Sequence, residues 1–188
     1  MNAVFPIVRV WPKFFTLQKG TREFDLPNIV HGELPARVIM GFVEADAFSG
    51  DSSLDPFKFQ PFKISQLSLN SNGRSIPAVP LVCDFENNHF KRAYHLLLDT
   101  VLGPCEDSET IGLSEEDFKN GKTFFAFTIA RTLTGQQASV PPKERGYLNC
   151  KLLFSEVLPK NVNAIICLEY LNSIEIDSAR NIYLDYSA

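Results

Sequence analysis

Apolar residues recur along the chain in short runs that have the length and alternation of β-strands. The runs lie at residues 5–17, 22–30, 36–44, 62–77, 122–129, 147–154, 162–171 and 173–186. From Leu148 to Phe154 every second residue is apolar, which places those side chains on one face of an extended chain. The run 36–44 is almost continuously apolar, as is typical of a strand buried on both faces. Turn signals separate the runs at intervals of about 8–12 residues, and the pattern predicts an all-β protein.

Proline and glycine positions refine this prediction. Pro6 and Pro12 cannot donate a backbone hydrogen bond, so the run 5–17 is expected to be an edge strand or a bent strand. Asn72 and Gly73 form the best hairpin signal of the chain, because both residue types accept a positive φ. Gly20 with Thr21, and residues 178–181, are expected to form further turns.

Two segments have the character of helices. Apolar residues in 88–102 recur every three or four positions, and Gly103–Pro104 follows, which predicts one amphipathic helix that covers a sheet edge or an open end of the sandwich. Ser114, followed by three acidic residues, predicts the start of a short second helix that ends at Gly121. The predicted architecture is a single antiparallel jelly-roll β-sandwich domain covering residues 1–188, with one amphipathic helix and a short second helix.

Composition and charge narrow the possible partners. The chain has 188 residues, of which 45% are hydrophobic and 21% are charged, as in ordinary folded domains. A formal net charge of −4 and a pI near 5.4 argue against direct nucleic-acid binding and against an anionic membrane surface. No apolar run approaches the roughly 20 residues of a membrane span. The first residues lack the pattern of a secretory signal, so we expect a protein that is not secreted.

The cysteines fit a reducing compartment. Cys83, Cys105, Cys150 and Cys167 are widely scattered, and the last two lie within predicted strands. We interpret them as free thiols, mostly buried, rather than as disulfide or metal ligands.

One acidic stretch, within residues 36–62, is the clearest candidate for chemistry. It carries Glu44, Asp46, Asp51 and Asp55. Four close carboxylates are typical either of a cation site or of a solvated turn, and the Ser-, Gly- and Asp-rich segment 49–56 favours the turn. We interpret 44–61 as a possible interaction loop whose carboxylates face water, while Phe48, Phe57, Phe59 and Phe62 tuck back onto the core.

Other catalytic and metal motifs are missing from the sequence. The three histidines are dispersed and no Cys-x-x-Cys pair occurs, so we predict no metal site. Neither a phosphate-binding glycine loop nor a Gly-x-Ser-x-Gly elbow is present, and His95 with Asp99 is interpreted as a surface hydrogen bond. The sequence therefore predicts no catalytic residue and no cofactor, and a hydrolase with an unrecognised site remains the weakest alternative.

Five segments, in order, resemble a known family. They are "LPARVIMGFVEADAFSGD" with "DPFKFQPF", then "FENNHFKRAYHLLL", "TFFAFTI" and "SIEIDSARNIYLDYS". Together they are similar to the C-terminal region of the capsid-like protein of Maverick/Polinton virus-like transposons and adinto-like viruses. The similarity runs from about Ile7 to Tyr186. Family members are longer, so this chain corresponds either to an excised second jelly roll or to a gene that keeps only that half.

The resemblance implies an architectural role. A capsid-type virion protein, or a domesticated relic of one, would act by self-association into trimers or larger assemblies with other capsid subunits. It would be found in virions, or inside the host cell before assembly. The alternative is a β-sandwich binding module that recognises a glycan, peptide or receptor through its end loops.

Overall fold

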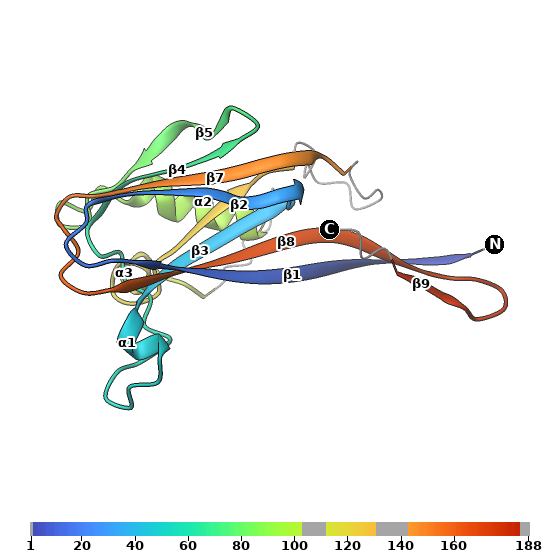
Figure 1. Ribbon diagram of the computed structural model, residues 1–188, viewed down its shortest axis with the longest axis horizontal. Helices are drawn as coiled ribbons and strands as arrows, with labels where there is room; N and C mark the ends of the chain where they lie inside the picture. The colour runs from blue at the N-terminus through green and yellow to red at the C-terminus, as the bar shows by residue number, and fades with distance from the viewer. Residues whose placement is uncertain (1, 103–111, 131–142, 185–188) are drawn as a thin grey trace.

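The computed structural model describes residues 2–102, 112–130 and 143–184, which form two antiparallel sheets and three helices. The first sheet has the order β1 (Ala3–Leu17), β8 (Val162–Ile176), β3 (Arg37–Glu44) and β6 (Phe124–Thr128), and β9 (Ile182–Leu184) pairs with β8. The second sheet has the order β2 (Glu23–Glu33), β7 (Arg145–Phe154), β4 (Ile64–Ser71) and β5 (Arg74–Val82). This alternation of strands between two facing four-strand sets is a jelly roll and confirms the predicted fold class (Figure 1).

The core lies between the two sheets and is rich in aromatic rings. Phe42 of β3 contacts Phe125 of the same sheet and Phe154 of the opposite sheet, with ring centres 6.0 and 6.2 Å apart. Both contacts are edge-to-face, the geometry that aromatic quadrupoles favour. All three rings are fully buried, so they join the layers at the centre of the sandwich.

The helices are α1 (Ala45–Phe48), α2 (Lys91–Leu102) and α3 (Glu115–Lys119). Helix α2 packs against β6 at the edge of the first sheet, as the amphipathic pattern predicted. Helix α3 begins with the predicted Ser114 cap: the Ser114 hydroxyl accepts from the Asp117 backbone N–H, and the Asp117 carboxylate accepts in return from the Ser114 backbone. The fully buried ring of Phe118 anchors α3 to the core.

Several local predictions are confirmed. Asn72 and Gly73 have φ values of 50° and 80° and join β4 to β5. Strand β1, with Pro6 and Pro12, lies at the edge of its sheet. The structure differs in two places. Residues 173–176 continue β8 instead of starting a new strand, because β1 extends far enough to pair with them. The acidic loop opens with the four-residue helix α1, which is too short for a periodic signal.

Strands β1 and β8 are unusually long. Each has 15 residues, and they pair along their whole length, from Leu17 with Val162 to Ala3 with Ile176. Typical strands have about five or six residues. The far ends of this pair, together with β9, project beyond the second sheet as a narrow arm that carries the N-terminus (Figure 1). We call residues 3–11, 169–176 and 182–184 the arm.

Candidate functional site

The four carboxylates of the acidic loop make different contacts, although Glu44, Asp46 and Asp51 all lie near the ammonium of Lys160. Glu44 pairs with Lys160 at 2.9 Å, and Asp46 is an exposed residue in the first turn of α1. Asp51 accepts hydrogen bonds from the backbone and hydroxyl of Ser53, at 2.9 and 2.7 Å, and these bonds lower the pKa of the Asp51 carboxyl. Asp55 accepts from the backbone N–H of Phe57 at 2.9 Å.

The contacts of Asp51 and Asp55 are those of turns, in which a carboxylate accepts from the backbone two residues later, whereas Glu44 forms an ion pair with Lys160. Within the described residues, His, Cys, Asp and Glu side chains nowhere gather in a group of three or more that would hold a metal ion. The chemistry of this loop is therefore that of a solvated, locally hydrogen-bonded turn.

The phenylalanines of this loop do not all tuck back as predicted. Phe59 contacts Phe124 of β6, with ring centres 4.6 Å apart, and Phe62 is partly buried against the core. Phe48 remains 43% exposed and contacts only the outer ring of Phe14 among the described aromatic pairs. Phe57 is 79% exposed, so its predicted burial is wrong. The turn in which Asp55 accepts from the Phe57 backbone holds Phe57 away from the sheet. The alternation of apolar and polar residues in the sequence does not predict this orientation of the Phe57 side chain.

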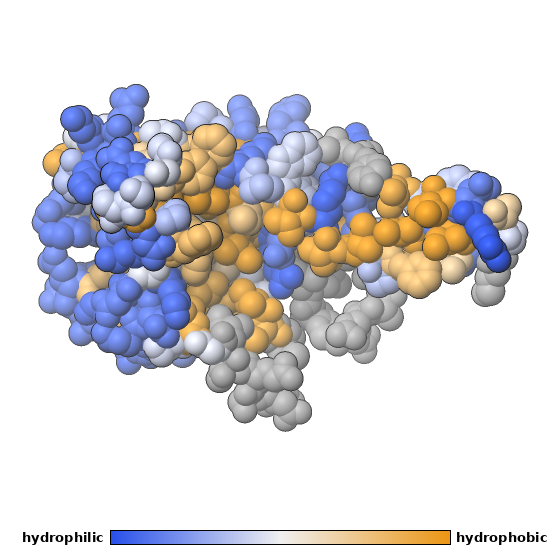
Figure 2. Space-filling model, turned by 90° about the horizontal axis from the view of Figure 1, so that it is seen from below, coloured by the Kyte–Doolittle hydropathy of each residue, from blue (hydrophilic) through white to orange (hydrophobic). Residues whose placement is uncertain are grey.

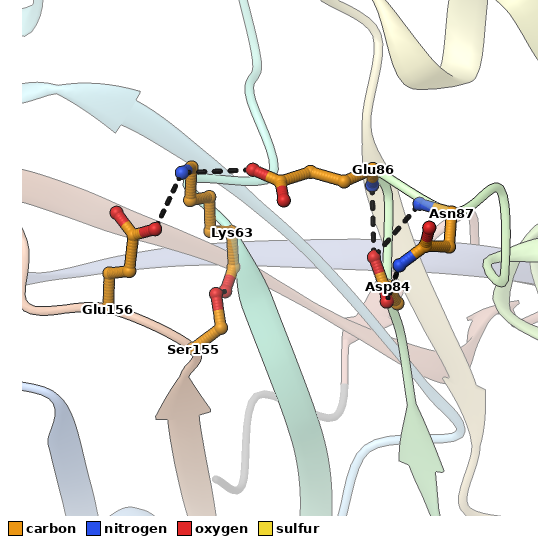
Figure 3. Close-up of polar contacts among 6 residues, drawn as sticks. All are labelled: Lys63, Asp84, Glu86, Asn87, Ser155 and Glu156. Carbon is orange, nitrogen blue, oxygen red and sulfur yellow. Dashed lines mark hydrogen bonds and ion pairs between the residues drawn. The ribbon is translucent and has the colours of Figure 1, made fainter.

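A cluster of charged side chains ties three connecting loops together at the end of the sandwich opposite the arm. Lys63 Nζ lies 2.8 Å from Glu156 Oε1 and 2.9 Å from Glu86 Oε1 (Figure 3). Hydrogen bonds to Glu156 and then to Glu86 raise the pKa of Lys63, so the ammonium stays charged at neutral pH. All three side chains are substantially exposed, so these ion pairs contribute modestly to stability. They have the character of a structural surface cluster rather than of a catalytic acid or base.

Backbone groups extend the same cluster. The hydroxyl of Ser155 donates to the carbonyl of Lys63 at 3.2 Å. The carboxylate of Asp84 accepts from the Asn87 side chain at 2.7 Å and from the backbone N–H groups of Asn87 and Glu86 at 3.0 and 3.1 Å (Figure 3). The loops at this end are thus held by hydrogen bonds and ion pairs between their own polar groups.

The cysteines that the structure describes are free thiols, as predicted. Cys83 and Cys150 are buried and Cys167 is partly buried. Burial raises the pKa of Cys83 to about 11 and raises that of Cys150 further. These thiols are therefore poor nucleophiles near neutral pH. Cys105 lies outside the described residues.

The arm is a second candidate surface, and sequence reasoning did not identify it. Its large exposed apolar residues have exposed fractions between 39% and 63%; they are Val4, Phe5, Val8, Val10, Trp11, Ile182, Tyr183 and Leu184. Apolar side chains extend from the body of the molecule along the projecting part (Figure 2). At about 150–250 Å² for a large side chain, these eight residues expose on the order of 800 Å² over both faces of the arm. Each face therefore exposes about half of that area, which is comparable with the largest contiguous apolar patch of a typical monomer, about 300–600 Å².

At the tip of the arm, one face is more uniformly apolar than the other. Side chains of odd-numbered β1 residues point toward the core where the second sheet covers them, as Leu17 does. Farther out, the strand register places Phe5, Ile174 and Leu184 in one row across this face. Ala3, Ile176 and Ile182 form the next row. On the opposite face, the row of Val4, Glu175 and Tyr183 contains a charge.

We call the first of these faces the inner face of the arm. At its base the guanidinium of Arg9 lies over the ring of Tyr170, 5.0 Å from the ring centre, and Trp11 follows toward the body. Such a cation–π contact helps to hold the side chains of Arg9 and Tyr170 in place at the point where the core ends and the arm begins. Among the described helices, none is both long and apolar enough to cross a bilayer.

The fold is similar to that of chains in two solved viral structures. The chain superposes over its full length on the structure of PBCV-1 VP54, as fitted into a reconstruction of the virophage Sputnik, with a TM-score of 0.58 and 9% identity. It also superposes on a chain of the Sputnik virophage itself with a TM-score of 0.53 and 8% identity. It spans 52% and 40% of those two chains, respectively.

Sequence comparison finds a relative over nearly the whole chain. The uncharacterized protein F54H12.2 of Caenorhabditis elegans is 24% identical over 185 residues, which is 96% of this chain and 43% of the worm protein. No family model matches the chain. The chain thus spans about half or less of the length of each of these proteins, and at such low identity the structural similarity establishes the jelly-roll fold alone.

Proposed function

We propose that this chain is a structural subunit of capsid type that acts by associating with copies of itself and with related subunits. The observation that carries the proposal is the coincidence of two features. The fold is shared with capsid proteins of PBCV-1 and Sputnik, and each face of the arm exposes an apolar surface about as large as the largest patch of a typical monomer, which is often a contact site.

The finer parts of the proposal rest on the sequence. The whole chain acts as one jelly-roll domain, and five of its segments, in sequence order, resemble the capsid-like protein of Maverick/Polinton elements, with a similarity that runs from about Ile7 to Tyr186. The role is architectural, because the described polar clusters are used for turns and loop fastening. The subunit forms trimers or larger assemblies and belongs to a virion, or to the cell interior before assembly. It has no direct contact with nucleic acid, in keeping with its net charge of −4.

The test is a concentration series of the purified chain followed by multi-angle light scattering. The monomer mass is 21.1 kDa, and we expect the mean mass to rise to trimers or larger species through the micromolar range. A protein that stays monomeric up to millimolar concentration contradicts the proposal. Electron microscopy of the concentrated fraction then reports whether the larger species are closed particles, sheets or discrete oligomers.

A further inference from the structure

We infer that the inner face of the arm is a contact surface for a second copy of this chain; this inference rests on the proposed function and names the surface that performs it. The inner face continues the core-facing side of the first sheet after the second sheet has ended. A sheet face of this composition is normally covered by another layer. Within the part of the chain that the structure describes, Phe5, Trp11 and Ile182 remain 52%, 48% and 63% exposed.

Hydrogen bonds within the chain fix the conformation of the arm in the isolated subunit. At its tip, the Asp177 carboxylate accepts from the backbone N–H groups of Ala179 and Asn181, each at 2.8 Å. It also accepts from the Asn181 side chain at 2.8 Å and from the Tyr183 hydroxyl at 3.2 Å. These bonds fix the turn that folds β9 back onto β8, so the apolar rows are already aligned. A preorganised surface loses less entropy on association.

Contact through the faces of the arm is favoured over contact through its edges. Pro6 and Pro12 are an even number of residues apart, so their missing N–H groups fall on the same side of β1. Among the described strands β1 pairs with β8 alone, so its other side is open. Proline nitrogens in a sheet face such an open side, because they have no N–H for the ladder, and there they obstruct the addition of another strand. The other edge is β9, which has only three residues.

A second copy matches the chemistry of this face. The two rows at the tip, with Phe5 and Ile182 in them, contain no charged side chain, so they need no oppositely charged patch on a partner. An identical arm offers the same uncharged rows, and the same surface can therefore cover itself.

The area agrees with a specific but weak contact. Four exposed residues of the inner face (Phe5, Trp11, Ile182 and Leu184) supply on the order of 400 Å² per copy. Together with the half-buried Ile7, Ile174 and Ile176, two copies bury about 1,000 Å², near the lower limit for specific interfaces. We therefore expect association in the micromolar rather than the nanomolar range.

The experiment compares three double variants of the full chain by sedimentation velocity and light scattering. The first, Phe5→Ser with Ile182→Ser, alters the inner face. The second, Val8→Ser with Val10→Ser, alters the opposite face of the arm, where both valines are about half exposed. The third, Phe57→Ser with Val157→Ser, removes one exposed phenylalanine and one exposed aliphatic residue away from the arm. None of them changes the net charge, and circular dichroism with a thermal melt verifies that each is folded.

We expect the inner-face variant to weaken association at least tenfold, and the other two variants to change it less than threefold. The inference is overturned if the inner-face variant, verified as folded, associates like the unaltered chain, or if the Phe57 and Val157 variant is equally impaired. Either result leaves self-association itself intact. If the unaltered chain never associates, the proposed function fails together with the inference, so the two failures are distinguishable. If the inner-face variant does not fold, single substitutions Phe5→Ser and Ile182→Ser apply the same criterion, each with at least a threefold effect.

Discussion

Phe118 should be one of the residues on which the stability of the molecule most depends. Its ring is fully buried and lies among four others: Tyr94 at 5.5 Å, Phe90 at 5.8 Å, Phe85 at 6.1 Å and Phe125 at 6.3 Å. Replacement by alanine removes the contacts with all four rings. Large-to-small substitutions of buried phenylalanine cost about 3–5 kcal/mol, depending on how far the site collapses.

Collapse is restricted around this residue, which places the expected cost in the upper part of that range. The Ser114 capping box holds the start of α3. The Thr123 hydroxyl donates to the Phe118 carbonyl at 2.6 Å and so holds the segment that follows α3. At about 2–4 °C per kcal/mol for a protein of this size, Phe118→Ala should lower the melting temperature by about 8–20 °C.

The assay is urea unfolding followed by circular dichroism, with thermal melts alongside. Phe57→Ala is the matched control, because it makes the same substitution at a ring that is 79% exposed. We expect the control to change the free energy of unfolding by less than about 0.5 kcal/mol. The urea m-value should stay the same, so that a shift in midpoint reports stability alone. A cost below about 1 kcal/mol for Phe118→Ala, or equal costs at the two positions, would refute the packing argument.

Two further predictions concern ionisation. Hydrogen bonds from the Asn87 side chain and backbone lower the pKa of Asp84 below its ordinary value of 3.8, so the stability they contribute is present above about pH 4 and is lost as the pH falls through the folded-state pKa. The variant Asp84→Asn should therefore have a lower free energy of unfolding than the unaltered chain at neutral pH. Between about pH 5 and pH 3 its free energy of unfolding should fall by less, as measured by urea unfolding. Parallel plots of the free energy of unfolding against pH for the two proteins would contradict this. Because burial raises the pKa of Cys83 and Cys150, both thiols should react with a thiol reagent at about pH 8 at least tenfold more slowly in the folded chain than in urea, as read by peptide mapping. Equal labelling rates in the two states would show that the sandwich opens readily around them.

Much of the fold was predictable because its signals are local. The hairpin at Asn72 and Gly73 depends on the φ preferences of two residues, and both adopt the positive values expected. The cap at Ser114 depends on one hydroxyl and a carboxylate three positions later. The edge position of β1 followed from Pro6 and Pro12, which remove backbone donors.

Other features were not predictable from the pattern, because they depend on distant parts of the chain. Phe57 and Phe118 have the same chemistry, and only the tertiary arrangement leaves one exposed and buries the other. Similarly, β8 continues through 172–176 because the start of β1 lies beside it. The run 3–11 does contain a usable signal for the arm. Apolar residues at both odd and even positions of an edge strand indicate that each face of the strand packs against another layer of protein, from the same chain or from a partner.

The pairing of β1 with β8 also constrains how the protein is made. Thr16 donates to the side chain of Asn163, 147 residues away in sequence, and the whole of β1 has partners at similar separations. At about 5–20 residues per second, a ribosome needs on the order of 10–40 s to deliver the missing partner of the first strand. During that interval β1 is already synthesised but its partner β8 is not, so the apolar side chains of β1 are exposed to solvent. Nascent chains should therefore depend on chaperones early, and ribosomes stalled before β8 is made should release aggregation-prone fragments.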